Sequence, residues 1–110
     1  MQIKSAAEAG AVVMAVSGSV DAATVADFDA EWKKCLDDGA QKLIVDLSGV
    51  DYISSAGLRG ILMLAKTAKA KAAKVGFAGA SGMVADMFRL SGFLSILAVF
   101  PDKNSALAGL

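Results

Sequence analysis

The organisation of this chain is clearest in one stretch, Asp46-Leu47-Ser48-Gly49-Val50-Asp51-Tyr52-Ile53-Ser54-Ser55-Ala56-Gly57-Leu58-Arg59-Gly60. It follows a compact apolar run, residues 42–47, whose composition is typical of a strand buried on both faces. Ser48-Gly49 is expected to break that strand. A helical apolar pattern then begins at Leu58 and predicts a helix over about residues 56–73. The stretch therefore predicts the end of a strand, a short loop and the first turn of a helix.

Two serines, Ser54 and Ser55, stand where this helix should begin. Serine is a preferred N-cap residue because its oxygen accepts a hydrogen bond from a free N–H group of the first turn. The same helix end carries roughly half a positive charge and free amide donors, so the fold tolerates a phosphate there. The residues alone leave both roles open, a plain cap or a phosphorylated hydroxyl.

One face of the predicted helix combines polar and apolar side chains. Ser55, Arg59 and Met63 are spaced four apart and so share this face. Gly60 lies inside the helix, where glycine costs about 1 kcal/mol relative to alanine. We therefore expect a neighbouring element to pack closely against Gly60.

The remaining segments alternate between strand and helix patterns. Residues 1–4 and 12–16 predict a hairpin with a turn at 8–10. A helix is expected from Asp21, as its N-cap, to residue 36, with Gly39 as its stop. Strands at 75–78 and 96–100 and helices at 83–90 and 102–110 complete the chain, the third helix being capped by Ser81. This order predicts an α/β fold with a largely parallel sheet.

Composition narrows the possible functions. The 110 residues suffice for one domain, 55% of them are hydrophobic, and the net charge is zero, as in a compact folded protein. No basic stripe alternates with aromatic residues, so nucleic acid is not an expected partner, and we expect Lys66, Lys69, Lys71 and Lys74 to form a solvated helix face. No apolar segment is long enough to span a bilayer and no signal peptide is evident, so no membrane association is expected.

Catalytic and metal chemistry have few candidate residues. The chain has no histidine, which excludes Ser–His and Cys–His nucleophile pairs and imidazole metal sites. Its one cysteine, Cys35, can form neither an internal disulfide nor a thiolate cluster, and we expect a buried, inert thiol in a cytoplasmic protein. Trp32, Met83 and Met87 are expected in the core. The sequence thus predicts a binding module without metal or cofactor, and not an enzyme.

Three segments carry a resemblance to a known family. Val50-Asp51-Tyr52-Ile53-Ser54-Ser55-Ala56-Gly57-Leu58-Arg59 resembles the signature of STAS domains of the anti-sigma factor antagonist type. Gly18-Ser19-Val20-Asp21 with Thr24 is similar to the entry to that family's first helix, and Met87-Phe88-Arg89-Leu90-Ser91-Gly92-Phe93 to the end of its third helix. The resemblance implies that residues 1–110 form a single STAS domain. Its sheet would be mixed but mostly parallel, with four to five strands and helices packed chiefly on one face.

The resemblance also implies a mechanism, partner switching in bacterial transcription regulation. The unphosphorylated domain would bind an anti-sigma factor that is also a serine kinase, and so release a sigma factor. The kinase would phosphorylate a serine that aligns with Ser55, and a PP2C-type phosphatase would reverse the switch. The free domain would be a monomer. The partner-binding residues would be Asp21, Thr24, Ser54, Ser55, Ala56, Gly57, Leu58, Arg59 and Met63.

Some family members carry an aspartate immediately before the phosphoacceptor, where this chain has Ser54. Ser54 is therefore the second candidate for phosphorylation, and a non-phosphorylated STAS scaffold in a sensor or lipid-transport complex is the alternative function. A phospho-aspartate receiver with Asp46 as acceptor would need an acidic pair after its first strand, and residues 1–18 offer only Glu8. A nucleotide enzyme would need a phosphate-binding loop ending in Lys-Ser or Lys-Thr, which the chain lacks.

Overall fold

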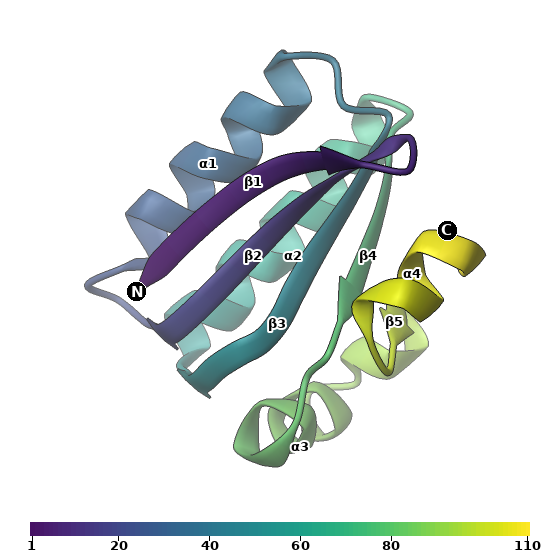
Figure 1. Ribbon diagram of the computed structural model, residues 1–110. Helices are drawn as coiled ribbons and strands as arrows, with labels where there is room; N and C mark the ends of the chain where they lie inside the picture. The colour runs from purple at the N-terminus through teal and green to yellow at the C-terminus, as the bar shows by residue number, and fades with distance from the viewer.

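The computed structural model describes residues 1–110, and its elements follow the predicted order of strands and helices. The strands are β1 (Gln2–Glu8), β2 (Ala11–Val20), β3 (Lys42–Ile53), β4 (Lys74–Ala78) and β5 (Ala98–Phe100). The helices are α1 (Val25–Asp37), α2 (Ser55–Ala70), α3 (Gly82–Leu90) and α4 (Lys103–Gly109), and a short 3-10 helix spans Phe93–Ser95. The five strands form one sheet in the order β1-β2-β3-β4-β5, with β1 antiparallel to β2 and the other pairs parallel (Figure 1).

The helices are divided unequally between the two faces of the sheet. The first three pack on one face over the main core, whose largest fully buried side chains include Trp32, Phe28, Phe77 and Phe88. The short α4 covers part of the other face over a smaller cluster that includes Ile44 (Figure 1). This arrangement confirms the expected mixed sheet with helices chiefly on one face.

The predicted break at Ser48-Gly49 is wrong, because β3 continues through it to Ile53. β2 likewise continues past Ser17-Gly18 to Val20 and pairs with β3 along this extension, with register shifts between Ala15 and Ser17 and between Gly18 and Ser19. A Cβ at Gly49 would lie 2.8 Å from the Ser17 Cβ. Glycine therefore permits a close approach at a strand irregularity here and does not mark a turn.

Several helices and strands also begin at residues other than those predicted. Thr24, not Asp21, occupies the N-cap position of α1, because the residues after Asp21 first form a hydrogen-bonded turn. The segment 93–97 forms the 3-10 helix and its exit, so β5 begins at Ala98 and not at residue 96. Gly39 follows the end of α1 with φ +97°, as expected for a residue that stops a helix.

The predicted core is confirmed for Trp32 and Cys35, which are both buried. The prediction that Met83 lies in the core is wrong, because the residue is 38% exposed. Val84 and Phe88 fill the buried face of α3, and Met87 packs only partly against the core. The four clustered lysines are exposed, as expected. No helix combines the length and the apolar character that crossing a bilayer requires.

Candidate functional site

The site forms where β2 and β3 end side by side. The two strands are parallel and their last residues, Val20 and Ile53, are paired. Parallel strands end at the same edge of a sheet, so the loop after β2 lies beside the start of α2. The Ser54 N–H donates to the Val20 carbonyl oxygen at 3.0 Å and joins the two segments directly.

Ser54 is the cap of α2. Its backbone is extended, with φ −96° and ψ 176°, and its Oγ accepts a hydrogen bond from the Gly57 N–H at 3.3 Å. The side chain is half-buried. The Ser54 oxygen is therefore already used to satisfy a donor at the start of the helix.

Ser55 is the first residue of α2, and its side chain is exposed. The first turn of α2 contains no acidic residue, and its free N–H groups carry partial positive charge. The Ser55 hydroxyl is thus accessible to an enzyme, in an environment that favours an added negative charge.

Gly57 and Leu58 support the site from beneath. Both are buried, and Leu58 belongs to the main core. A Cβ at Gly57 would overlap the Val20 carbonyl oxygen and lie 2.8 Å from the Ile53 Cγ1. Only glycine therefore lets the first turn of α2 rest against the end of β2. Because Gly57 and Leu58 are both buried, a partner protein could contact little of their surface.

Asp21 and Thr24 fix the neighbouring loop. The Asp21 Oδ1 accepts from the N–H groups of Ala23 at 2.9 Å and Thr24 at 3.2 Å. The Thr24 hydroxyl donates to the Ser19 carbonyl oxygen at 2.9 Å and accepts from the Asp21 N–H at 3.0 Å. Both side chains are half-buried, so they order the loop beside Ser55 and still present part of their surface.

The exposed face of α2 is the one predicted from the spacing. Ser55, Arg59 and Met63 all reach solvent, and Met63 is 49% exposed. Ala56 lies at the margin of this face and is half-buried. The structure therefore leaves Ser55, Arg59 and Met63 accessible on one face of α2, with Ala56 at its margin, and buries Gly57 and Leu58.

A pocket of about 160 Å³ opens beside this face, between α1 and α2. Its lining residues are Val25, Asp29, Ala56, Arg59, Gly60 and Met63. The expected close packing at Gly60 is confirmed, because a Cβ there would lie 2.8 Å from the Val25 Cγ2 and 3.0 Å from the Asp29 Oδ1. The sequence interpretation missed Val25 and Asp29 as site residues. Asp29 follows Val25 by one turn of α1, but nothing in the sequence places these two residues opposite α2.

Comparison with known proteins now identifies the fold and the family. The sequence model of the STAS domain matches residues 2–106. The chain belongs to the STAS domain family. It is 33% identical over 99 residues to BtrV of Bordetella bronchiseptica, described as an anti-sigma factor antagonist, a match that covers 90% of this chain and 85% of BtrV.

Solved structures show the same STAS fold. The crystal structure of an anti-sigma factor antagonist from Mycobacterium paratuberculosis superposes with a TM-score of 0.89 at 22% identity, covering 97% of this chain and 91% of that one. The Bacillus cell fate determinant SpoIIAA in its phosphorylated form gives a TM-score of 0.74 at 18% identity, covering 97% of both chains. The resemblance noted from the sequence is thereby confirmed.

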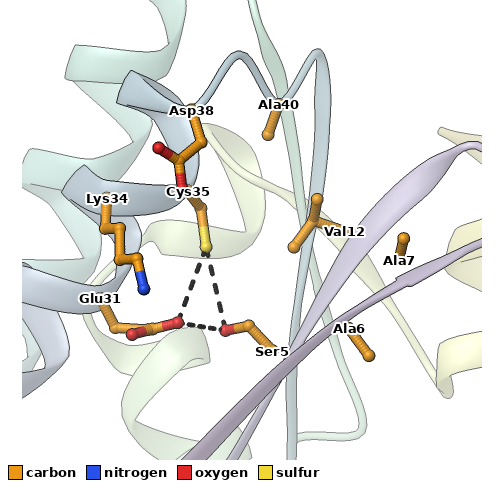
Figure 2. A pocket seen from close by; sticks show the side chains of 9 residues that line it. All are labelled: Ser5, Ala6, Ala7, Val12, Glu31, Lys34, Cys35, Asp38 and Ala40. Carbon is orange, nitrogen blue, oxygen red and sulfur yellow. Dashed lines mark hydrogen bonds between the residues drawn. The ribbon is translucent and has the colours of Figure 1, made fainter.

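The STAS domain has a second pocket near Cys35, away from Ser55, bounded by β1, β2 and α1 (Figure 2). The Ser5 hydroxyl donates to the Glu31 Oε2 at 2.6 Å, and the Cys35 sulfur lies 3.8 Å from the Ser5 oxygen and 3.9 Å from that Glu31 oxygen. Burial raises the pKa of the Cys35 thiol, so the thiol stays protonated at neutral pH and is a weak nucleophile. The Cys35 thiol is therefore not an activated nucleophile.

Proposed function

We propose that this STAS domain is a cytoplasmic anti-sigma factor antagonist controlled by phosphorylation of Ser55. Unphosphorylated, it binds a serine-kinase anti-sigma factor and so releases a sigma factor. Phosphorylation of Ser55 by that kinase ends the binding, and a PP2C-type phosphatase restores it. The observation that carries the proposal is the exposed Ser55 side chain at the start of α2, next to a serine that already caps the helix.

The geometry favours Ser55 over Ser54 as the phosphoacceptor. A phosphate on Ser54 would have to be placed on a half-buried oxygen that accepts from the Gly57 N–H. A phosphate on Ser55 disturbs no hydrogen bond that the cap needs. Ser54 therefore keeps the helix start in place while its neighbour is modified and restored.

Charge is sufficient to explain the switch. A phosphoserine adds about −1.5 to −2 charges at neutral pH. Like charges forced together at an interface cost several kcal/mol, and about 3 kcal/mol weakens binding on the order of a hundredfold. Arg59, one turn further along α2, is exposed and suited to pair with an acidic group of the partner while Ser55 is unmodified.

The comparisons support this proposal at the level of the family. BtrV is described as an anti-sigma factor antagonist, and SpoIIAA has been solved in a phosphorylated form. SpoIIAA shares the fold of this chain, and BtrV is similar to it in sequence. The non-phosphorylated scaffold is therefore the reading that the experiment must separate from the switch.

The test uses the serine-kinase anti-sigma factor that co-purifies with this chain from its native cell, prepared afterwards in pure form. Ser55→Ala should bind the kinase as the wild type does and stay bound after incubation with ATP. Ser55→Glu should bind at least a hundredfold more weakly with the fold intact, and phosphosite mapping of the wild type should find Ser55. A Ser55→Glu variant that binds as tightly as the wild type, with no phosphate on Ser55, would make the chain a scaffold.

A further inference from the structure

The pocket between α1 and α2 has the size of one side chain. Its volume is about 160 Å³, and an apolar cavity of about 150 Å³ in another protein is large enough to hold benzene. Arg59 and Met63 belong both to this pocket and to the exposed face that begins at Ser55. A partner that covers this face would therefore also cover the mouth of the pocket.

The lining combines apolar surface with one carboxylate, that of Asp29, and one guanidinium, that of Arg59. Val25, Ala56, Gly60 and Met63 supply the apolar part. The half-buried Asp29 accepts from the Trp32 Nε1–H through its Oδ1 at 2.9 Å. The ion pairs of this chain are Lys71–Asp37, Arg89–Asp86 and Lys103–Glu8, so no cation lies within 4.0 Å of Asp29. A carboxylate has about four acceptor sites, and Asp29 therefore retains most of its capacity.

We propose that this pocket receives one basic side chain, a lysine or an arginine, of the anti-sigma factor partner. The aliphatic stem of that side chain packs against Val25 and Met63, and its cation pairs with the Asp29 carboxylate. Lysine and arginine combine these two chemistries in one side chain. The inference rests on the proposed function, because it needs a protein partner on the Ser55 face.

Other occupants fit the charge of the pocket less well. A purely apolar side chain would remove water from the Asp29 carboxylate and give it no new partner, which is unfavourable. An acidic side chain would be repelled by it. Arg59 also lines the pocket and carries the same charge as the proposed occupant, but it is exposed and forms no ion pair with Asp29, so its side chain can turn toward solvent or toward an acidic group of the partner. The partner surface is therefore expected to present a basic residue with an acidic residue beside it.

Two variants test the charge and the space of the pocket separately, with the purified kinase as the probe. Asp29→Asn removes the charge and keeps a side-chain oxygen for the Trp32 indole, and Ala56→Leu fills the pocket. Each should weaken binding at least tenfold, and the loss caused by Asp29→Asn should shrink as salt is added. Two matched controls change exposed positions of the same helices, Asp27→Asn on α1 and Ala70→Leu at the end of α2. Their affinity for the kinase should stay within twofold of that of the wild type.

A double-mutant cycle identifies the occupant. Surface lysines and arginines of the kinase are changed singly to alanine. One of these changes should weaken the binding of the wild-type STAS domain but should cause no further loss of affinity for the Asp29→Asn variant. Melting temperature and far-UV circular dichroism check that each variant is folded. If Asp29→Asn binds as the wild type does, the proposal is wrong, whether Ala56→Leu is affected or not.

The two proposals fail in different ways. When Ser55→Glu loses binding and Asp29→Asn does not, the phosphorylation switch stands and the basic occupant is refuted. When the wild type binds no serine-kinase anti-sigma factor at all, the proposed function is refuted and the occupant of the pocket with it.

Discussion

Ser54 and Ser55 are chemically identical neighbours with different surroundings. The Ser54 Oγ accepts from the Gly57 N–H and is half-buried, whereas the Ser55 side chain is exposed on the first residue of α2. The backbone change from an extended residue to a helical one turns the two side chains toward different environments. One serine can therefore hold the helix start while the other is chemically modified.

Because Ser54 and Ser55 have different roles, replacing each with alanine should change the free energy of unfolding by a different amount. Ser54→Ala should lower the free energy of unfolding by about 1 kcal/mol, because the Gly57 N–H loses its acceptor. Ser55→Ala should change it by less than about 0.5 kcal/mol, as expected for an exposed side chain. Chemical denaturation of the two variants measures both values. A larger loss in Ser55→Ala than in Ser54→Ala would mean that Ser55, and not Ser54, caps the helix.

Asp102 provides a pH-dependent cap at the other end of the chain. Its Oδ1 accepts from the Ser105 N–H at 2.7 Å at the start of α4, and this hydrogen bond lowers the pKa of the carboxyl below its ordinary value. A lowered pKa in the folded state means that the stabilisation is present above about pH 4, the ordinary value, and is lost as the pH falls through the folded pKa. We expect hydrogen-exchange protection at Ser105 and Ala106 to fall in acid in the wild type. In Asp102→Asn, whose cap has no charge to titrate, the protection should depend less on pH.

At the scale of the elements, sequence periodicity predicted which side chains share a helix face more accurately than it predicted where helices and strands begin and end. The spacing of Ser55, Arg59 and Met63 was enough to place them on one exposed face, and Gly60 was enough to predict a close neighbour. The break expected at Ser48-Gly49 was wrong because a glycine in a turn and a glycine beside a strand irregularity look the same locally. Only the pairing with Ser17 separates the two cases.

The pocket at Asp29 could not be predicted for a related reason. Its walls come from α1 and α2, which are separate in the sequence, and the way they cross depends on the packing of Gly60 against Val25. Local patterns show which face of each helix is apolar, but they do not determine which residues of two helices meet. The candidate site was therefore predictable on α2 and incomplete on α1.

The exposed face of α2 should contribute to binding without contributing much to stability. Arg59→Glu and Met63→Asp should each weaken binding to the anti-sigma factor kinase at least tenfold, because one reverses a charge and the other places a charge on an apolar contact surface. Both residues are exposed in the free protein, so the melting temperature should change by no more than about 4 °C. Calorimetric titration and thermal unfolding measure the two effects.

Lys4→Glu is the control for charge reversal at an exposed position, on the edge strand β1. It should leave the affinity for the kinase unchanged. Unchanged affinity in Arg59→Glu and Met63→Asp as well would move the interface to another part of the surface.

At the scale of the whole molecule, the candidate site lies at one end of the sheet, where the backbone is held in place by its neighbours. The start of α2 is attached to β2 through the Ser54–Val20 hydrogen bond, and Gly57 and Leu58 pack beneath it. A phosphate added at Ser55 therefore meets a fixed surface. In the proposed switch, the charge itself would be the signal to the partner, and no second conformation of the STAS domain would be needed.

This rigidity predicts opposite effects of a negative charge on stability and on binding. A negative group near the N-terminus of a helix stabilises it by about 0.3–1 kcal/mol, and the first turn of α2 contains no acidic residue to oppose it. For a chain of this size, Ser55→Glu should raise the melting temperature by about 1–8 °C at low salt, and the gain should shrink in high salt. The same variant should lose binding at least a hundredfold, with amide chemical-shift changes confined to the loop after β2 and the first turns of α2. A fall in melting temperature, or shift changes that extend across the sheet, would mean that the charge acts by altering the fold and not by repelling the partner.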